Sequence, residues 1–149
     1  PRRLPLALVT NILGGPSANS LLNVSLRERH GLSYNIEASY TPYGDCGIVA
    51  IYFSSDHANA DRCLELLDAE IDPLSSRRLS MAKKQFVAQL AISMESNEGY
   101  MLGAGKSFLT HDEVDTMERV YAKIEALTAS QLTEVAEEIF ASPSRLIYR

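Results

Sequence analysis

The chain has 149 residues, 46% apolar and 22% charged, which is ordinary for a soluble globular protein, so residues 1–149 are expected to form one domain around a single core. The net charge of −5 argues against nucleic acid as a main partner, because no excess of basic residues offsets it. Its apolar runs are too short to cross a bilayer. The first residues show neither a leader peptide nor an initiator Met, so we expect a fragment of a larger protein, with its compartment unknown.

Two helices are predicted at the start of the chain. Leu4, Leu8 and Ile12 recur at helical spacing, and the small residues 14–15 followed by Pro16 end this helix. A second helix opens near residue 17 and ends at Gly31, because glycine favours the left-handed conformation that stops a helix. The residues expected on its buried face are Ala18, Leu21, Leu22, Ser25 and Leu26.

A β-hairpin is predicted to follow. Residues 33–41 alternate between apolar and polar side chains, which is the period of a half-buried strand, with Tyr34 and Ile36 on the apolar face. After a turn at residues 42–45, the apolar run of residues 47–53 indicates a second, antiparallel strand that is covered on both faces. Residues 145–149 are predicted to form a third, short strand.

The remaining sequence is predicted to be helical. One helix is capped by Asp56 and closed by Asp72-Pro73, and a longer helix over residues 76–95 carries Lys83 on its outer face. Residues 96–99 break the pattern before a helix over residues 100–109. Two capping boxes, residues 110–113 and residues 128–131, are expected to open the last two helices.

This order of elements predicts the fold class α+β, with an antiparallel or mixed sheet and helices packed mainly on one face, because the helices are grouped and do not alternate with the strands. A sheet of three strands would have an open edge. Since bare edges invite pairing, another chain, including a second copy of this one, could fill that edge.

Two kinds of site are disfavoured. The histidines at positions 30, 57 and 111 lie far apart, so we expect no metal site in this chain. Gly103 to Ser107 is similar to the end of a phosphate-binding loop, but an earlier glycine and an upstream strand are missing, so close helix packing explains these small residues better. Cys46 and Cys63 are interpreted as small buried thiols, and a bridge between them is left open.

The segment from Leu26 to Tyr34, preceded by Asn11-Ile12-Leu13-Gly14-Gly15, resembles the metal-free, C-terminal-type half of the pitrilysin/insulinase-type zinc peptidases. The resemblance implies that Arg27 and Tyr34 contact an extended peptide substrate and stabilise the tetrahedral intermediate. It also implies that zinc lies in a partner half carrying H-x-x-E-H, in the same precursor or in a separate subunit. A chain of this kind should not hydrolyse peptides alone.

Other interpretations stay open at this point. A cation in the last turn of a helix, such as Arg27, is favoured by the helix dipole alone. Tyr34 could be a core residue on the apolar face of its strand. The chain could also be a catalytically silent assembly subunit of the same fold, or an unrelated α+β domain that binds a small ligand.

Overall fold

The computed structural model describes residues 2–71 and 76–148. The chain divides into two compact units, of which unit 1 is Pro1–Leu74 with Ala129–Arg149 and unit 2 is Ser75–Thr128. The elements of unit 1 are α1 (Arg3–Gly14), the π-helix η1 (Asn23–Arg29), β1 (Ile36–Pro42), β2 (Gly47–Phe53), the 3-10 helix η2 (His57–Asn59), α2 (Ala60–Ile71) and α6 (Ala129–Phe140).

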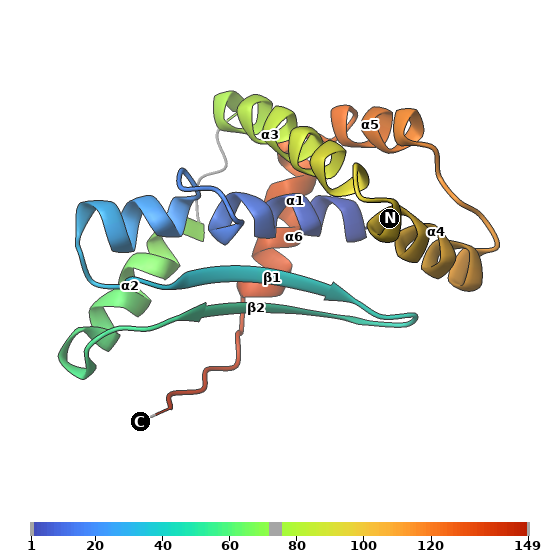
Figure 1. Ribbon diagram of the computed structural model, residues 1–149. Helices are drawn as coiled ribbons and strands as arrows, with labels where there is room; N and C mark the ends of the chain where they lie inside the picture. Colours follow the sequence, from blue (N-terminus) through green and yellow to red (C-terminus); the bar gives the residue numbers. More distant parts are fainter. Residues whose placement is uncertain (1, 72–75, 149) are drawn as a thin grey trace. The chain divides into compact units, whose positions relative to one another are not determined.

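Unit 1 is built on an antiparallel hairpin with α1 packed against β1, which agrees with the predicted α+β class (Figure 1). The register pairs Ile36 with Phe53 and Pro42 with Gly47. Helix and strand approach closely at Gly14, where an added Cβ would lie 2.7 Å from the backbone nitrogen of Ala38. The glycine at this position is therefore needed for packing.

The second strand differs from its prediction. Ile48 and Tyr52 are 56% and 57% exposed, so β2 is not covered on both faces as its apolar run suggested. The described residues pair β2 with β1 alone, and residues 145–148 form no strand, so the predicted third strand is wrong for the part described. A continuous apolar run marks a strand but does not reveal which of its faces the rest of the chain covers.

Helix α1 contacts both the turn of this hairpin and helix α6. Arg3, at the start of α1, donates hydrogen bonds to the carbonyl oxygens of Tyr43 and Gly44 at 2.6 and 2.8 Å. Helix α6 packs against α1, and Arg2 pairs with Glu138. These contacts join the two ends of the unit.

Helix α2 begins differently from its prediction. A short 3-10 helix precedes it, and Asp56 makes no side-chain capping bond there. The predicted stop at Asp72-Pro73 falls outside the described residues. The helix buries Cys63, whereas Cys46 is exposed, and both thiols are free. The interpretation of both cysteines as buried was therefore wrong for Cys46.

Unit 2 consists of α3 (Ser76–Met94), α4 (Asn97–His111) and α5 (Met117–Glu125), with α3 packed against both of the others. Leu79 and Ile124 are buried in this unit. Lys83 was predicted on an outer face, but it is only 9% exposed and its Nζ donates to the carbonyl oxygen of Glu125 at 2.6 Å. The ammonium thus satisfies a carbonyl at the end of α5, which explains why it is buried.

The capping box predicted at residues 110–113 was also wrong. Helix α4 continues to His111 inside this segment, and its C-cap is Asp112, whose φ of 54° lies in the left-handed region. The cap of α5 is Thr116, whose hydroxyl accepts a hydrogen bond from the backbone N–H of Arg119 at 3.4 Å. The predicted break between the two helices is present but shorter, because it lies at residues 95–96 and α4 already begins at Asn97, where Ser96 caps it by accepting from the N–H of Gly99.

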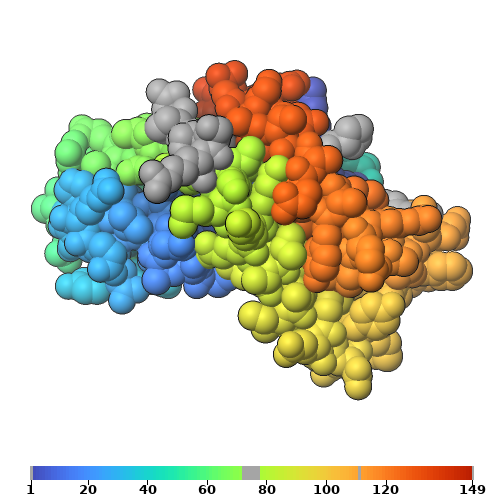
Figure 2. Space-filling model, turned by 90° about the horizontal axis from the view of Figure 1, so that it is seen from above, coloured from blue at the N-terminus to red at the C-terminus, as the bar shows by residue number. Residues whose placement is uncertain are grey.

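Helix α4 exposes much of its apolar surface. An added Cβ at Gly103 or Gly105 would meet nothing within 4 Å, so close helix packing does not explain these glycines. Leu109 is 86% exposed, and the yellow atoms of α4 lie at the surface in the space-filling view (Figure 2). Among the described residues, no helix is both long enough and apolar enough to span a membrane.

Candidate functional site

The corner between η1 and β1 carries both residues that the sequence singled out. Leu22 and Leu26 are fully buried and hold this segment in the core, and η1 packs against α2. The segment is a π-helix, which has a wider turn than the predicted α-helix and often occurs at functional sites. Ala18, expected on the buried face, is exposed. The predicted inner face is otherwise correct.

The corner is closed by glycine and by two backbone hydrogen bonds. Gly31 has a φ of 62°, as predicted for a helix stop. The N–H of Gly31 donates to the carbonyl oxygen of Arg27 at 3.0 Å, and the N–H of Leu32 donates to that of Leu26 at 2.8 Å. Each bond spans one residue more than in a Schellman motif, as a π-helical end requires. These two bonds hold the backbone from Leu26 to Leu32.

Arg27 lies in the last turn of η1 with its side chain exposed. Its Nε is 3.8 Å from Oε1 of Glu28, and both side chains are more than half exposed. A surface ion pair of this length contributes little to stability, so the guanidinium is free to bind another group. Arg29 and His30 are also exposed at this helix end.

Tyr34 is not a core residue. It is 85% exposed and precedes β1, which begins at Ile36 and not at residue 33 as predicted. A bend at this residue reverses the alternation, and Ser33 is buried instead, with its hydroxyl donating to the carbonyl oxygen of Asn35 at 3.3 Å. Within residues 2–71 and 76–148, the Tyr34 hydroxyl makes no hydrogen bond. The phenol is therefore available to a ligand.

The structure gives a further polar contact that the sequence did not suggest. His30 Nδ1 is 2.8 Å from the carbonyl oxygen of Ser25, a residue that is only 2% exposed. A histidine close to a helix end was the only sequence signal for this contact, and it did not identify the acceptor five residues earlier.

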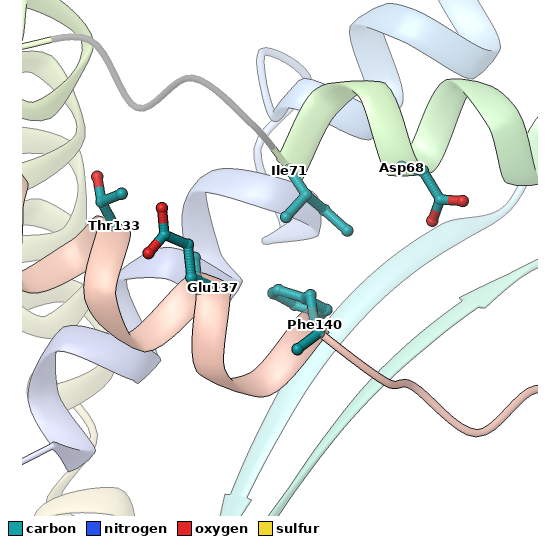
Figure 3. Close-up of a pocket in the computed structure, with 7 residues that line it drawn as sticks. Asp68, Ile71, Thr133, Glu137 and Phe140 are labelled. Atoms are coloured by element: carbon teal, nitrogen blue, oxygen red, sulfur yellow. The ribbon is translucent and has the colours of Figure 1, made fainter.

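The groove between α2 and α6 is a separate feature of unit 1 (Figure 3). It has a volume of about 300 Å³, and neither Arg27 nor Tyr34 lines it. Its Asp68 already has a partner, because both carboxylate oxygens accept from the Arg145 guanidinium at 2.9 and 3.2 Å. The lining residues are Asp68, Ile71, Thr133, Ala136, Glu137, Phe140 and Ala141.

The described residues offer no group of three or more His, Cys, Asp or Glu side chains that could hold a metal ion. The candidate site thus consists of hydrogen-bonding side chains on a fixed corner of an α+β unit. Such a corner is suited to binding a polar ligand, and zinc does not fit the residues that this part of the chain provides.

Comparison with known proteins identifies the family. Residues 1–86 match the family described as peptidase M16 inactive domain, and the chain belongs to that family. This membership confirms the resemblance stated above and removes the alternative of an unrelated ligand-binding domain.

The relatives are longer proteins. The chain is 26% identical over 140 residues to the uncharacterized zinc protease YmxG of Bacillus subtilis, covering 91% of this chain and 34% of the relative. A zinc protease of Streptomyces coelicolor is 23% identical over 143 residues, with 93% and 31% covered. The chain therefore spans about a third of the length of these curated relatives.

Solved structures share the fold. A peptidase M16 inactive domain from Pseudomonas fluorescens matches with a TM-score of 0.77 and 21% identity, covering 93% of this chain and 34% of that one. A chain of complex III2 from Candida albicans matches with a TM-score of 0.79 and 15% identity, covering 93% and 36%.

Proposed function

We propose that this chain is the non-metal-binding half of a zinc-dependent endopeptidase and that Arg27 and Tyr34 bind an extended peptide substrate for a partner half. The observation that carries the proposal is the exposure of both side chains on one closed corner, in a chain of the M16 inactive-domain family. The names of the curated relatives, which are zinc proteases, support the same activity.

The two side chains supply complementary hydrogen-bond donors. The Arg27 guanidinium is a rigid, permanently charged fork, and the Tyr34 hydroxyl is a single neutral donor. Both can donate to the carbonyl oxygen of the scissile bond, and such donors bind more strongly as negative charge develops on that oxygen. The π-helical end and the Gly31 stop hold the backbone of this corner, so binding requires ordering of the two side chains and not of the backbone that carries them.

Zinc belongs to the partner half in this proposal. That half would carry H-x-x-E-H, either in the same precursor or as a separate subunit, and would supply the metal chemistry. The part of this chain that the structure describes holds no candidate metal ligands in a group, so its contribution is substrate binding and charge stabilisation.

The test is to measure kcat for Arg27→Ala and Tyr34→Phe in the complete protease. Removing one oxyanion donor typically lowers kcat by about 10²–10³-fold, or about 2.7–4 kcal/mol, and we expect losses of this order with zinc content unchanged. Arg29→Ala removes an exposed arginine from the same helix end and should leave kcat close to the wild-type value. Wild-type kcat in both Arg27→Ala and Tyr34→Phe would refute the proposal.

A second candidate function is a catalytically silent assembly subunit. A chain of the Candida albicans complex III2 has the same fold, so this fold also occurs within a larger assembly. The two functions differ in the partner half, since a peptidase requires an intact H-x-x-E-H there and a scaffold does not. Absence of peptide hydrolysis by the purified complete protein in the presence of added zinc would favour the scaffold.

A further inference from the structure

His30 has a fixed ring orientation at the candidate site. Its Nδ1 lies 2.8 Å from the carbonyl oxygen of Ser25, and a carbonyl oxygen can only accept, so Nδ1 carries the proton and donates. In the uncharged ring, Nε2 then has a lone pair and acts as an acceptor. The residue is exposed, whereas Ser25 is buried, so a buried carbonyl anchors one edge of a ring at the surface.

His30 also lies in the segment that carries the other two ligand-binding side chains. The carbonyl oxygen of Arg27 accepts from the N–H groups of both His30 and Gly31, which places these three residues in one turn of backbone. Tyr34 follows three residues after the glycine. The corner therefore presents two donors and one oriented acceptor from a stretch of eight residues, 27–34.

An extended peptide needs both kinds of partner. Its backbone presents carbonyl oxygens and N–H groups along each edge, and peptide-binding surfaces gain affinity by pairing both. Arg27 and the Tyr34 hydroxyl can serve a carbonyl oxygen. Among the other side chains of the corner, Glu28 lies beside the Arg27 guanidinium, and the buried Ser33 hydroxyl donates to Asn35. His30 Nε2 is the acceptor with a defined direction.

We propose that His30 Nε2 accepts a hydrogen bond from a backbone N–H of the bound peptide, beside the carbonyl group that Arg27 and Tyr34 hold. This inference rests on the proposed function and extends it to substrate selection. A peptide with proline or an N-methylated residue at that position has no N–H to donate. Such peptides bind less well, and His30 is the residue that discriminates against them.

The test uses the complete protease and an internally quenched synthetic peptide that it cleaves, together with a series in which each backbone nitrogen is methylated in turn. Because a neutral hydrogen bond contributes about 0.5–1.5 kcal/mol, wild-type kcat/KM should fall about 3–10-fold at the position that faces His30, in addition to any steric loss. The assays are run at about pH 8, where free histidine is uncharged.

Two amide variants distinguish the role of His30 Nδ1 from that of Nε2. His30→Asn can keep the bond to Ser25 with its amide nitrogen but places no acceptor where Nε2 lies. His30→Gln places an amide oxygen near Nε2 but gives up the bond to Ser25. We expect His30→Asn to lower kcat/KM for the unmodified peptide about 3–10-fold, with partial rescue in His30→Gln. His57→Asn, at an exposed histidine in η2, is the matched control and should behave as wild type.

The decisive comparison is between His30→Asn and wild type across the methylated series. If His30 binds the N–H, the variant loses the position-specific penalty, because the two changes remove the same hydrogen bond and are not additive. An identical penalty at every position in both proteins would overturn the inference. The proposed function would still stand in that case if Arg27→Ala and Tyr34→Phe lower kcat, and would fall with it if they do not.

Discussion

Gly31→Ala tests whether the left-handed glycine fixes the corner that carries Arg27 and Tyr34. Gly31 has a φ of 62°, and an added Cβ would meet nothing within 4 Å, so no steric clash contributes to the effect. The cost for an L-residue in this conformation is roughly 1–2 kcal/mol. Alanine also restricts the unfolded chain, which returns about 0.4–1 kcal/mol. We therefore expect a net loss of about 0.5–1 kcal/mol in the free energy of unfolding.

Gly44→Ala is the matched control in the same unit. An added Cβ at Gly44 would also meet nothing within 4 Å, but its φ is outside the left-handed region, so only the effect on the unfolded chain remains. This variant should be unchanged or more stable by about 0.4–1 kcal/mol. Gly31→Asn should lose less than Gly31→Ala, because asparagine tolerates the left-handed conformation.

Urea unfolding followed by far-UV circular dichroism measures all three variants. The two alanine variants should differ in the free energy of unfolding by about 1–2 kcal/mol, from the conformational cost of the left-handed backbone. If Gly31→Ala and Gly44→Ala have equal midpoints and slopes, the left-handed backbone at Gly31 is not what limits this position, and the account of the corner given above is wrong.

Two further outcomes follow from unit 2. Lys83→Met removes the ammonium that donates to the carbonyl oxygen of Glu125, and urea unfolding should show that the free energy of unfolding falls by about 1.5–3 kcal/mol. The control Lys84→Met, at an exposed lysine, should stay within about 0.5 kcal/mol of wild type. Equal losses in the two variants would contradict the role of the buried ammonium. A backbone N–H and then the Thr116 hydroxyl lower the pKa of Glu118, so its contribution to stability is present at neutral pH and is lost as the pH falls through the lowered pKa. Thr116→Ala should raise the pKa of Glu118 part of the way back in an NMR titration, and an unchanged pKa would rule out the hydroxyl as a cause.

Local signals in the sequence predicted the frame of the candidate site. The apolar spacing of the first helix, the hairpin and the stop at Gly31 are all properties of short segments, and the structure has all three. The resemblance of the segment around Arg27 gave the family, which the comparison confirmed. The roles of Arg27 and Tyr34 stay predictions.

Two of the errors arose where residues far apart in the sequence determine burial, and a third arose at a local bend. Lys83 is buried because the backbone carbonyl oxygen of Glu125, 42 residues later, accepts a hydrogen bond from its Nζ, and no local pattern reveals that pairing. The second strand has an apolar run, but its exposure depends on which elements cover it. Tyr34 was expected on a buried face because alternation was continued through a bend, where the burial of Ser33 reverses the two faces.

The π-helical form of η1 has a consequence for how this segment tolerates insertions and deletions. A π-helical turn accommodates about one residue more than an α-helical turn, so losing a single residue between Asn23 and Arg29 could restore an ordinary helix without breaking it. The ordinary turn would absorb the missing residue, so the flanking side chains would keep their direction and the fold would stay intact. The same deletion in an ordinary helix such as α1 would turn every following residue by about 100°, so η1 should tolerate the loss of one residue better than α1 does.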